Sequence, residues 1–297
     1  MKRIISFFTV AVFLVGLFSC ASTSAAVQSG SSVWKVSRGG NTIFLGGSVH
    51  ILRNKDFPLP REFDLAFSQS TMLVLEADIE QMENEELAQY LVSQMVLPGG
   101  RTLQSILEPA VYALLKAECA KYGFSIEAVS NFKPSMVLTM LSMLQVQKTG
   151  FVQQGVDAHF LEKAHRAEMP VNFLETVETQ IDMLLAMGEG YENDFVRYSL
   201  SDMSDNDDEN VLIALVTEWR TGGMAISEAS LIELKETWPA IYQTLVADRN
   251  AAWIPQIEEY LDSGQRPFIV VGLFHMHGPD GLLTQLENSG CTVEQLR

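Results

Sequence analysis

The segment Ile43-Phe44-Leu45-Gly46-Gly47-Ser48-Val49-His50 decides the fold, because an apolar run leads into glycines and then into a histidine. Phe268-Ile269-Val270-Val271-Gly272-Leu273-Phe274-His275 repeats this arrangement near the C-terminus. Short continuous apolar runs are typical of strands that are buried on both faces of a sheet. In both segments a glycine stands three residues before the final histidine. Glycine lets the chain leave a strand sharply and lets a ligand approach the backbone, so we interpret both Gly-x-x-His motifs as parts of one site.

Two other apolar runs end in a glutamate. Met72–Leu75 leads into Glu76, and Val171–Leu174 leads into Glu175. In open α/β sheets, functional sites form beyond the carboxyl ends of the strands. If the four runs are strands of one direction, both histidines and both glutamates gather at one edge of the sheet. Two imidazoles and one carboxylate suit zinc, manganese or a similar ion and leave a position open for water.

The remaining pattern is that of an α/β protein with a helical middle region. Val33–Val36 and Thr42–Leu45 flank a turn-rich linker and predict a β-hairpin, and Thr292–Leu296 predicts a last strand. Strands that alternate with helices predict a mixed central β-sheet flanked by helices. Apolar residues recur at helical spacing in Leu103–Tyr122, Pro134–Gln147, Val156–Ala167, Thr176–Met187, Leu231–Glu236 and Pro239–Leu261.

Composition restricts the class of partner. The chain of 297 residues carries 20 basic and 37 acidic residues, which give a formal net charge of −17. A general nucleic-acid binder needs a basic footprint, so we predict no nucleic-acid partner. The apolar content of 47% is typical of a globular protein.

The N-terminus has the features of a bacterial export signal. A short basic start precedes the apolar run Ile4–Leu17, which is shorter than an ordinary transmembrane helix. Leu17-Phe18-Ser19-Cys20 then resembles a lipobox, in which Cys20 would become the lipidated first residue. Ordinary signal cleavage near residues 25–26 is the alternative.

This signal divides the chain into a lipoprotein signal peptide at residues 1–20, a small polar tether at 21–32 and a folded domain at 33–297. Ala21 follows Cys20 where an inner-membrane retention signal would have Asp. We therefore expect an exported lipoprotein, anchored through Cys20 at the periplasmic face of the outer membrane. An oxidising space permits a disulfide between Cys119 and Cys291, although we favour two buried thiols. Because no Cys-x-x-Cys pair exists, a cysteine-based zinc site is excluded.

Further motifs surround the two Gly-x-x-His segments in a fixed order. After Trp34 and the first segment come Leu59-Pro60, Leu75-Glu76-Ala77-Asp78, Gly155-Val156-Asp157, Leu174-Glu175-Thr176-Val177-Glu178-Thr179-Gln180, Arg249-Asn250 and Gly278-Pro279-Asp280-Gly281-Leu282. This ordered set, over about residues 34–297, resembles the TraB/PrgY/GumN family, which is related to the Tiki-type metalloproteases. Ser48 stands where the family usually has Thr, a change that keeps the hydroxyl group.

The resemblance implies an EreA/ChaN-like fold and a site whose residues have distinct roles. A divalent metal (Mn, Co or Zn) would be bound by His50, Glu76 and His275. The residues that act in catalysis would be Glu76, Glu175 and Arg249. The supporting residues would be Gly47, Asp157, Asn250 and Gly272.

Two functions stay open at this stage. The first is a metal-dependent hydrolase, a peptidase or amidase, in which activated water attacks a peptide or small amide. The second is a non-catalytic lipoprotein that binds haem, iron or a peptide, as the related ChaN-like lipoproteins suggest. Structural alternatives also exist: Asp157 as a helix cap, and Arg249-Asn250 as a tie between helix and loop. His277 is a candidate extra ligand on geometry alone.

Overall fold

The computed structural model describes residues 30–78, 80–81, 84–151, 153–203 and 208–297. The predicted signal peptide, the lipidation site Cys20 and nearly all of the predicted tether lie outside the described residues. Among the residues that are described, no helix combines the length and the apolar character needed to cross a membrane.

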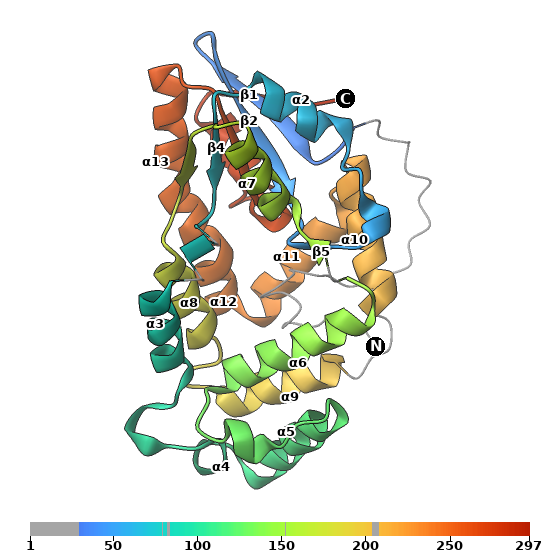
Figure 1. The fold of residues 1–297 in the computed structure, drawn as a ribbon, viewed down its shortest axis with the longest axis vertical. Helices are drawn as coiled ribbons and strands as arrows, with labels where there is room; N and C mark the ends of the chain where they lie inside the picture. The colour runs from blue at the N-terminus through green and yellow to red at the C-terminus, as the bar shows by residue number, and fades with distance from the viewer. Residues whose placement is uncertain (1–29, 79, 82–83, 152, 204–207) are drawn as a thin grey trace.

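A six-stranded sheet in the order β6-β4-β7-β2-β1-β8 forms the centre of the domain (Figure 1). Its strands are β1 (Val33–Arg38), β2 (Asn41–Ser48), β4 (Met72–Leu75), β6 (Val171–Phe173), β7 (Pro267–Gly272) and β8 (Thr292–Gln295). The four strands β2, β7, β4 and β6 are mutually parallel, whereas β1 pairs antiparallel with both β2 and β8. The predicted mixed sheet, its opening hairpin and its last strand are therefore confirmed.

Helices flank the sheet, and two of them meet it through aromatic side chains. Phe63 of α2 (Arg61–Gln69) and Phe160 of α7 (Val156–Arg166) pack against Phe268 of β7, with ring centroids 6.2 and 5.2 Å away. On the other side in Figure 1 runs α13 (Asp248–Ser263), which contacts β2. The C-terminal part of the chain also forms α10 (Asp208–Thr221), α11 (Ala225–Thr237), α12 (Pro239–Tyr242) and α14 (Leu282–Asn288).

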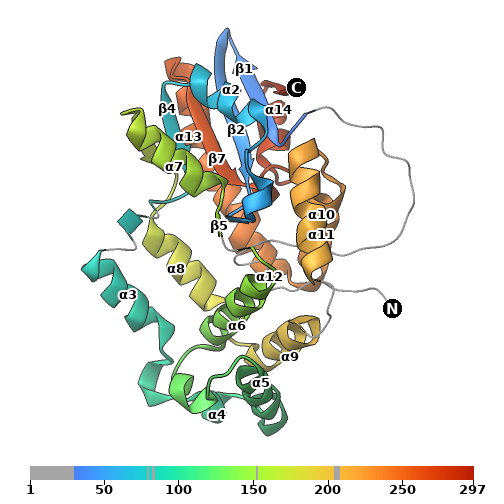
Figure 2. The ribbon, with the colours of Figure 1, turned by 45° about the vertical axis from the view of Figure 1, so that its right-hand side comes forward.

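The middle of the chain forms a helical arm beyond the carboxyl ends of the parallel strands (Figure 2). Its helices are α3 (Glu85–Met95), α4 (Leu103–Ile106), α5 (Pro109–Lys121), α6 (Pro134–Lys148), α8 (Val177–Ala186) and α9 (Glu192–Met203). The helical middle region is thus confirmed. The single helix predicted over Leu103–Tyr122 is wrong, because Pro109 opens a new helix and the residue before a proline is driven out of the helical conformation.

The glycines of the first motif serve strand packing rather than a strand exit. β2 continues through Gly46 and Gly47 to Ser48, three residues past the predicted end at Leu45. A Cβ on Gly46 would lie 2.8 Å from the ring of Phe268, and one on Gly47 would lie 2.8 Å from Leu273. Close approach between neighbouring layers therefore requires both glycines.

The two cysteines outside the signal are free and buried, as we favoured. Cys119 lies in α5, where burial raises the pKa of its thiol to about 11. A thiol held in this state is inert, so it has a packing role.

Candidate functional site

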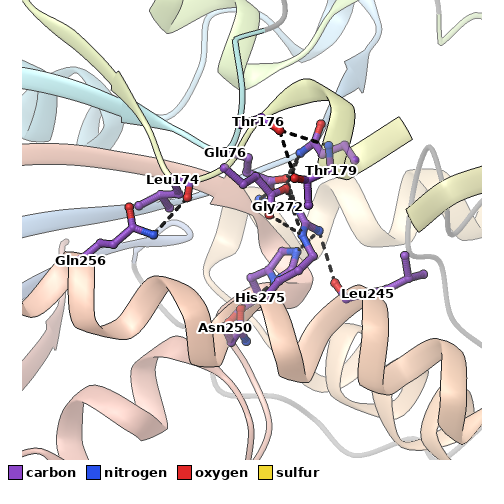
Figure 3. A network of polar contacts seen from close by, with 12 residues as sticks. Glu76, Leu174, Thr176, Thr179, Leu245, Asn250, Gln256, Gly272 and His275 are labelled. Atoms are coloured by element: carbon purple, nitrogen blue, oxygen red, sulfur yellow. Dashed lines mark hydrogen bonds and ion pairs between the residues drawn. The ribbon is translucent and has the colours of Figure 1, made fainter. Parts of the chain in front are cut away.

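Residues from the carboxyl ends of all four parallel strands meet at one edge of the sheet. His50 follows β2, Glu76 follows β4, Glu175 follows β6 and His275 follows β7. Ser48 of β2 stands beside Gly272 of β7 in the register, which brings the two Gly-x-x-His motifs together. The predicted gathering of two histidines and two glutamates therefore exists in the fold, and Figure 3 shows the polar network around Glu76 and His275.

Arg249, in the first turn of α13, links three of these side chains. Its Nη2 donates to Glu76 Oε2 at 2.5 Å and to Glu175 Oε1 at 2.6 Å. Its Nη1 lies 2.8 Å from His275 Nε2, and its guanidinium carbon lies 4.6 Å from the ring centroid of Trp253. The side chain is only 12% exposed. A buried guanidinium with two carboxylates is a tightly held charge, not a simple tie between helix and loop.

Glu76 accepts hydrogen bonds on both of its carboxylate oxygens. Its Oε1 accepts from the backbone N–H of Gly272 at 2.6 Å, and its Oε2 accepts from Gln180 at 3.0 Å as well as from Arg249. Burial opposes ionisation, but Arg249, the two histidines and the Gly272 N–H outweigh it and hold the pKa of Glu76 well below its usual range. Glu76 is therefore ionised at any physiological pH.

Asn250 fixes the orientation and tautomer of His275. The Asn250 amide group donates to the carbonyls of His275 at 3.1 Å and Asp280 at 2.7 Å, so its Oδ1 must accept from His275 Nδ1 at 2.7 Å. The lone pair of the ring consequently lies on Nε2, where Arg249 donates to it. Burial and the charge of Arg249 lower the pKa of His275 to about 3, so this imidazole is neutral.

His50 stands in the opposite electrostatic setting. Its Nδ1 lies 3.1 Å from Asp157 Oδ1, which also accepts from Ser48 Oγ at 2.7 Å. Desolvation disfavours the imidazolium, but Asp157 and then Glu76 outweigh it and raise the pKa of His50 to about 9. Because 41% of the His50 side chain is exposed, solvent screens part of this attraction. The exposed ring marks the side from which a solute reaches the site.

Gly155 explains how Asp157 comes so close to His50. A Cβ at Gly155 would lie 2.4 Å from the carbonyl carbon and oxygen of His50, a distance that no side chain tolerates. Val156 N–H also donates to the carbonyl of Val49 at 3.1 Å, which clamps the start of α7 against the first motif. Gly155 itself is the N-cap, and Asp157 bonds to Ser48 and His50, so the alternative role of Asp157 as a helix cap is wrong.

The position that a side chain on Gly272 would take lies between the three predicted ligands. A Cβ built on Gly272 would be 3.3 Å from Glu76 Oε1, 3.5 Å from His275 Cδ2 and 3.6 Å from His50 Nε2. Across the part of the chain that the structure describes, however, no three His, Cys, Asp or Glu side chains stand at metal-binding geometry. The Arg249 guanidinium is instead bonded to Glu76 and to the lone pair of His275.

Gln180, the last residue of one of the predicted motifs, contacts both glutamates, whereas sequence reasoning did not predict the contact of Trp253. Gln180, in the first turn of α8, bridges Glu76 and Glu175 at 3.0 and 2.9 Å, and the ring of Trp253 lies tilted against that of His275 with ring centroids 4.5 Å apart. Both come from helix faces whose direction depends on tertiary packing. His277 is buried edge-on against Trp34, and its Nε2 has no hydrogen-bond partner among the described residues. Nothing in this arrangement joins His277 to the other histidines.

The fold and the site together define an α/β protein whose two Gly-x-x-His motifs meet acid, amide and guanidinium groups at the carboxyl edge of a mixed sheet. The sequence profile of the TraB/PrgY/gumN family matches residues 32–295. The chain therefore belongs to the TraB/PrgY/gumN family, as the motifs indicated. No curated protein matches the chain.

Proposed function

We propose that this protein is a metal-dependent hydrolase that cleaves peptide or small amide bonds. The observation that carries the proposal is the presentation of the two imidazoles. Nδ1 of His50 is tied to Asp157 and Nδ1 of His275 to Asn250, while both rings border the space next to Glu76 Oε1. Histidines that bind metals are typically held in this way, because an acceptor on one ring nitrogen orients the other toward the ion.

The charge of the cluster supports the same proposal. Glu76, Glu175 and Asp157 contribute three carboxylates, and Arg249 supplies one permanent positive charge. With a neutral His50, two negative charges remain uncompensated, which is the charge of one divalent cation. The same excess of negative charge raises the pKa of His50, because a proton on His50 neutralises part of that charge. The donor set thus suits Mn, Co or Zn in type and charge, provided that Arg249 shifts.

In this proposal, His50, Glu76 and His275 would hold the ion, which would supply Lewis acidity to water and to the scissile carbonyl. Asp157 and Asn250 keep the two rings oriented. Oε2 of Glu175, which lies 3.2 Å from Arg249 Nε, would accept the proton from the attacking water. Arg249 would stabilise negative charge on the carbonyl oxygen.

The cellular setting is also part of the proposal. Cys20 would anchor the protein as an exported lipoprotein at the periplasmic face of the outer membrane, so the substrate would be a peptide or small amide outside the cytoplasm. Metabolic labelling with a palmitate analogue tests this, because labelling should be lost in Cys20→Ser and retained in Cys119→Ser.

The decisive experiment measures metal binding by the purified full chain. Wild type should bind about one Mn²⁺, Co²⁺ or Zn²⁺ per chain, and His50→Ala and His275→Ala should each lose it. His165→Ala is the matched control, because His165 pairs with Glu80 on the surface. A screen of peptide and amide substrates with the bound metal then follows. If wild type binds none of these ions but gives a Soret band on haem titration, ligand capture replaces hydrolysis as the function.

A further inference from the structure

Arg249 occupies the donor atoms that a metal ion would need. Its Nη1 lies 2.8 Å from His275 Nε2, and its Nη2 lies 2.5 Å from Glu76 Oε2. A neutral imidazole nitrogen has one lone pair, so His275 Nε2 cannot accept a hydrogen bond from Arg249 and coordinate a cation at the same time. The guanidinium and a divalent ion therefore exclude each other at His275.

A second set of acceptors for the same guanidinium lies outside the three predicted ligands. Glu175 receives Nε at 3.1 and 3.2 Å and Nη2 at 2.6 Å, and the carbonyl of Leu245 receives Nη1 at 3.3 Å. Arg249 would keep a charged partner and a backbone partner if it left His275 and Glu76. Gln180, which donates to both glutamates, would continue to satisfy Glu76 Oε2.

The backbone just before Arg249 is built for this arrangement. Gln243–Ala247 form a π-helix between α12 and α13. The wider turn changes the usual pairing of backbone carbonyls, and the carbonyl of Leu245 accepts from the Arg249 side chain. Short π-helical segments are unusual and occur frequently at functional sites. The π-helix thus lies directly before the turn that carries Arg249 and provides one of its acceptors.

We propose that Arg249 is an internal competitor for the divalent ion. In the metal-free protein its guanidinium compensates Glu76 and caps the lone pair of His275. Metal binding displaces it from these two side chains and leaves it bonded to Glu175 and the carbonyl of Leu245, beside the reacting groups. This inference rests on the proposed function, and it predicts that the affinity for metal is set by the exchange between two cations rather than by the ligands alone.

The test compares the affinity for Zn²⁺, measured by calorimetry, of the full-length wild type and two variants. Arg249→Met removes the competitor but leaves two buried carboxylates without the guanidinium that compensates their charge, which threatens folding. The double variant Arg249→Met/Glu175→Gln removes one charge of each sign, so the cluster keeps its net charge while the competitor is gone. Arg101→Met is the matched control, because Arg101 is exposed in the helical arm. We expect the double variant to bind Zn²⁺ about tenfold or more tightly than wild type, the factor that corresponds to one lost charge-assisted hydrogen bond.

A readout in the wild type is independent of any variant. ¹⁵N NMR of the arginine side chains should show that Arg249 changes its environment when Zn²⁺ is added, while Arg101 does not. Equal or weaker Zn²⁺ binding by the double variant, or an Arg249 signal that Zn²⁺ leaves in place, would overturn the inference and leave the hydrolase proposal intact. If neither wild type nor any variant binds an ion, the proposed hydrolase function fails, and the inference fails with it.

Discussion

Gly272→Ala should weaken metal binding while leaving the stability of the fold almost unchanged. Gly272 has a φ of −50° and a ψ of 137°, a conformation that alanine adopts freely. The added methyl would lie 3.5 Å from His275 Cδ2 and 3.6 Å from His50 Nε2, both ordinary contacts. Only Glu76 Oε1, at 3.3 Å, must yield by a few tenths of an ångström. We therefore expect the free energy of unfolding to change by less than about 1 kcal/mol, since alanine also lowers the entropy of the unfolded chain.

The effect on metal binding should be much larger. An ion bound at about 2.0–2.2 Å to the histidine and glutamate donors must share the space that the methyl fills. We expect the affinity for Zn²⁺ to fall about tenfold or more in calorimetry, with chemical denaturation run on the same preparation. The reasoning is refuted if Gly272→Ala binds Zn²⁺ as tightly as wild type, or if the variant unfolds before binding can be measured.

Four further predictions follow from the contacts of the two histidines. The pKa of His50 is raised from 6.5 to about 9, so its pairing with Asp157 stabilises the metal-free protein fully below pH 6.5 and ceases to do so as the pH rises through 9. In denaturation, the excess stability of wild type over Asp157→Asn should shrink across that range; a constant difference contradicts the assignment. At neutral pH, Zn²⁺ binding should release about one proton from His50, read from calorimetry in buffers of different ionisation enthalpy. Gly155→Ala should lower the free energy of unfolding by about 3 kcal/mol, because its methyl would overlap the backbone of His50. A smaller loss, measured by chemical denaturation, would show that the two backbone segments can move apart to admit the methyl. Asn250→Ala should weaken Zn²⁺ binding about 10–100-fold in the same calorimetry because His275 loses its oriented tautomer, and unchanged affinity would exclude that role.

The positions of the strand-end site residues could be predicted from the sequence, because the sequence pattern indicates both the burial of the strands and their shared direction. Continuous apolar runs such as Met72–Leu75 indicate strands covered on both faces, and such strands are parallel in an α/β sheet. Parallel strands place their following residues at one edge, so Glu76 and His275 had to be neighbours once the runs were recognised. Arg249 and Asp157 entered through the family resemblance, not through any pattern of spacing.

The contacts within the site could not be read in the same way. That Arg249 bonds to the lone pair of His275 depends on how α13, which follows a π-helix, is rotated about its axis against the sheet. That Asp157 faces His50 depends on an approach of two backbones that only Gly155 permits. These are tertiary distances of a few ångströms, and helical periodicity does not specify them.

The two Gly-x-x-His motifs look like copies but create unlike environments. Their strands are adjacent and parallel, yet Gly47 pairs with Val271 rather than with Gly272, so the motifs are offset by one residue. Each motif then meets a different helix: α7 brings a carboxylate to His50, and α13 brings a guanidinium to His275. The first imidazole consequently attracts a proton and the second excludes one, with pKa values of about 9 and about 3. Such a pair offers a divalent ion one nitrogen that carries no proton, on His275, and one whose proton the ion must replace, on His50. The sheet therefore sets the positions of the ligands, while the flanking helices set their pKa values and so the pH at which they bind.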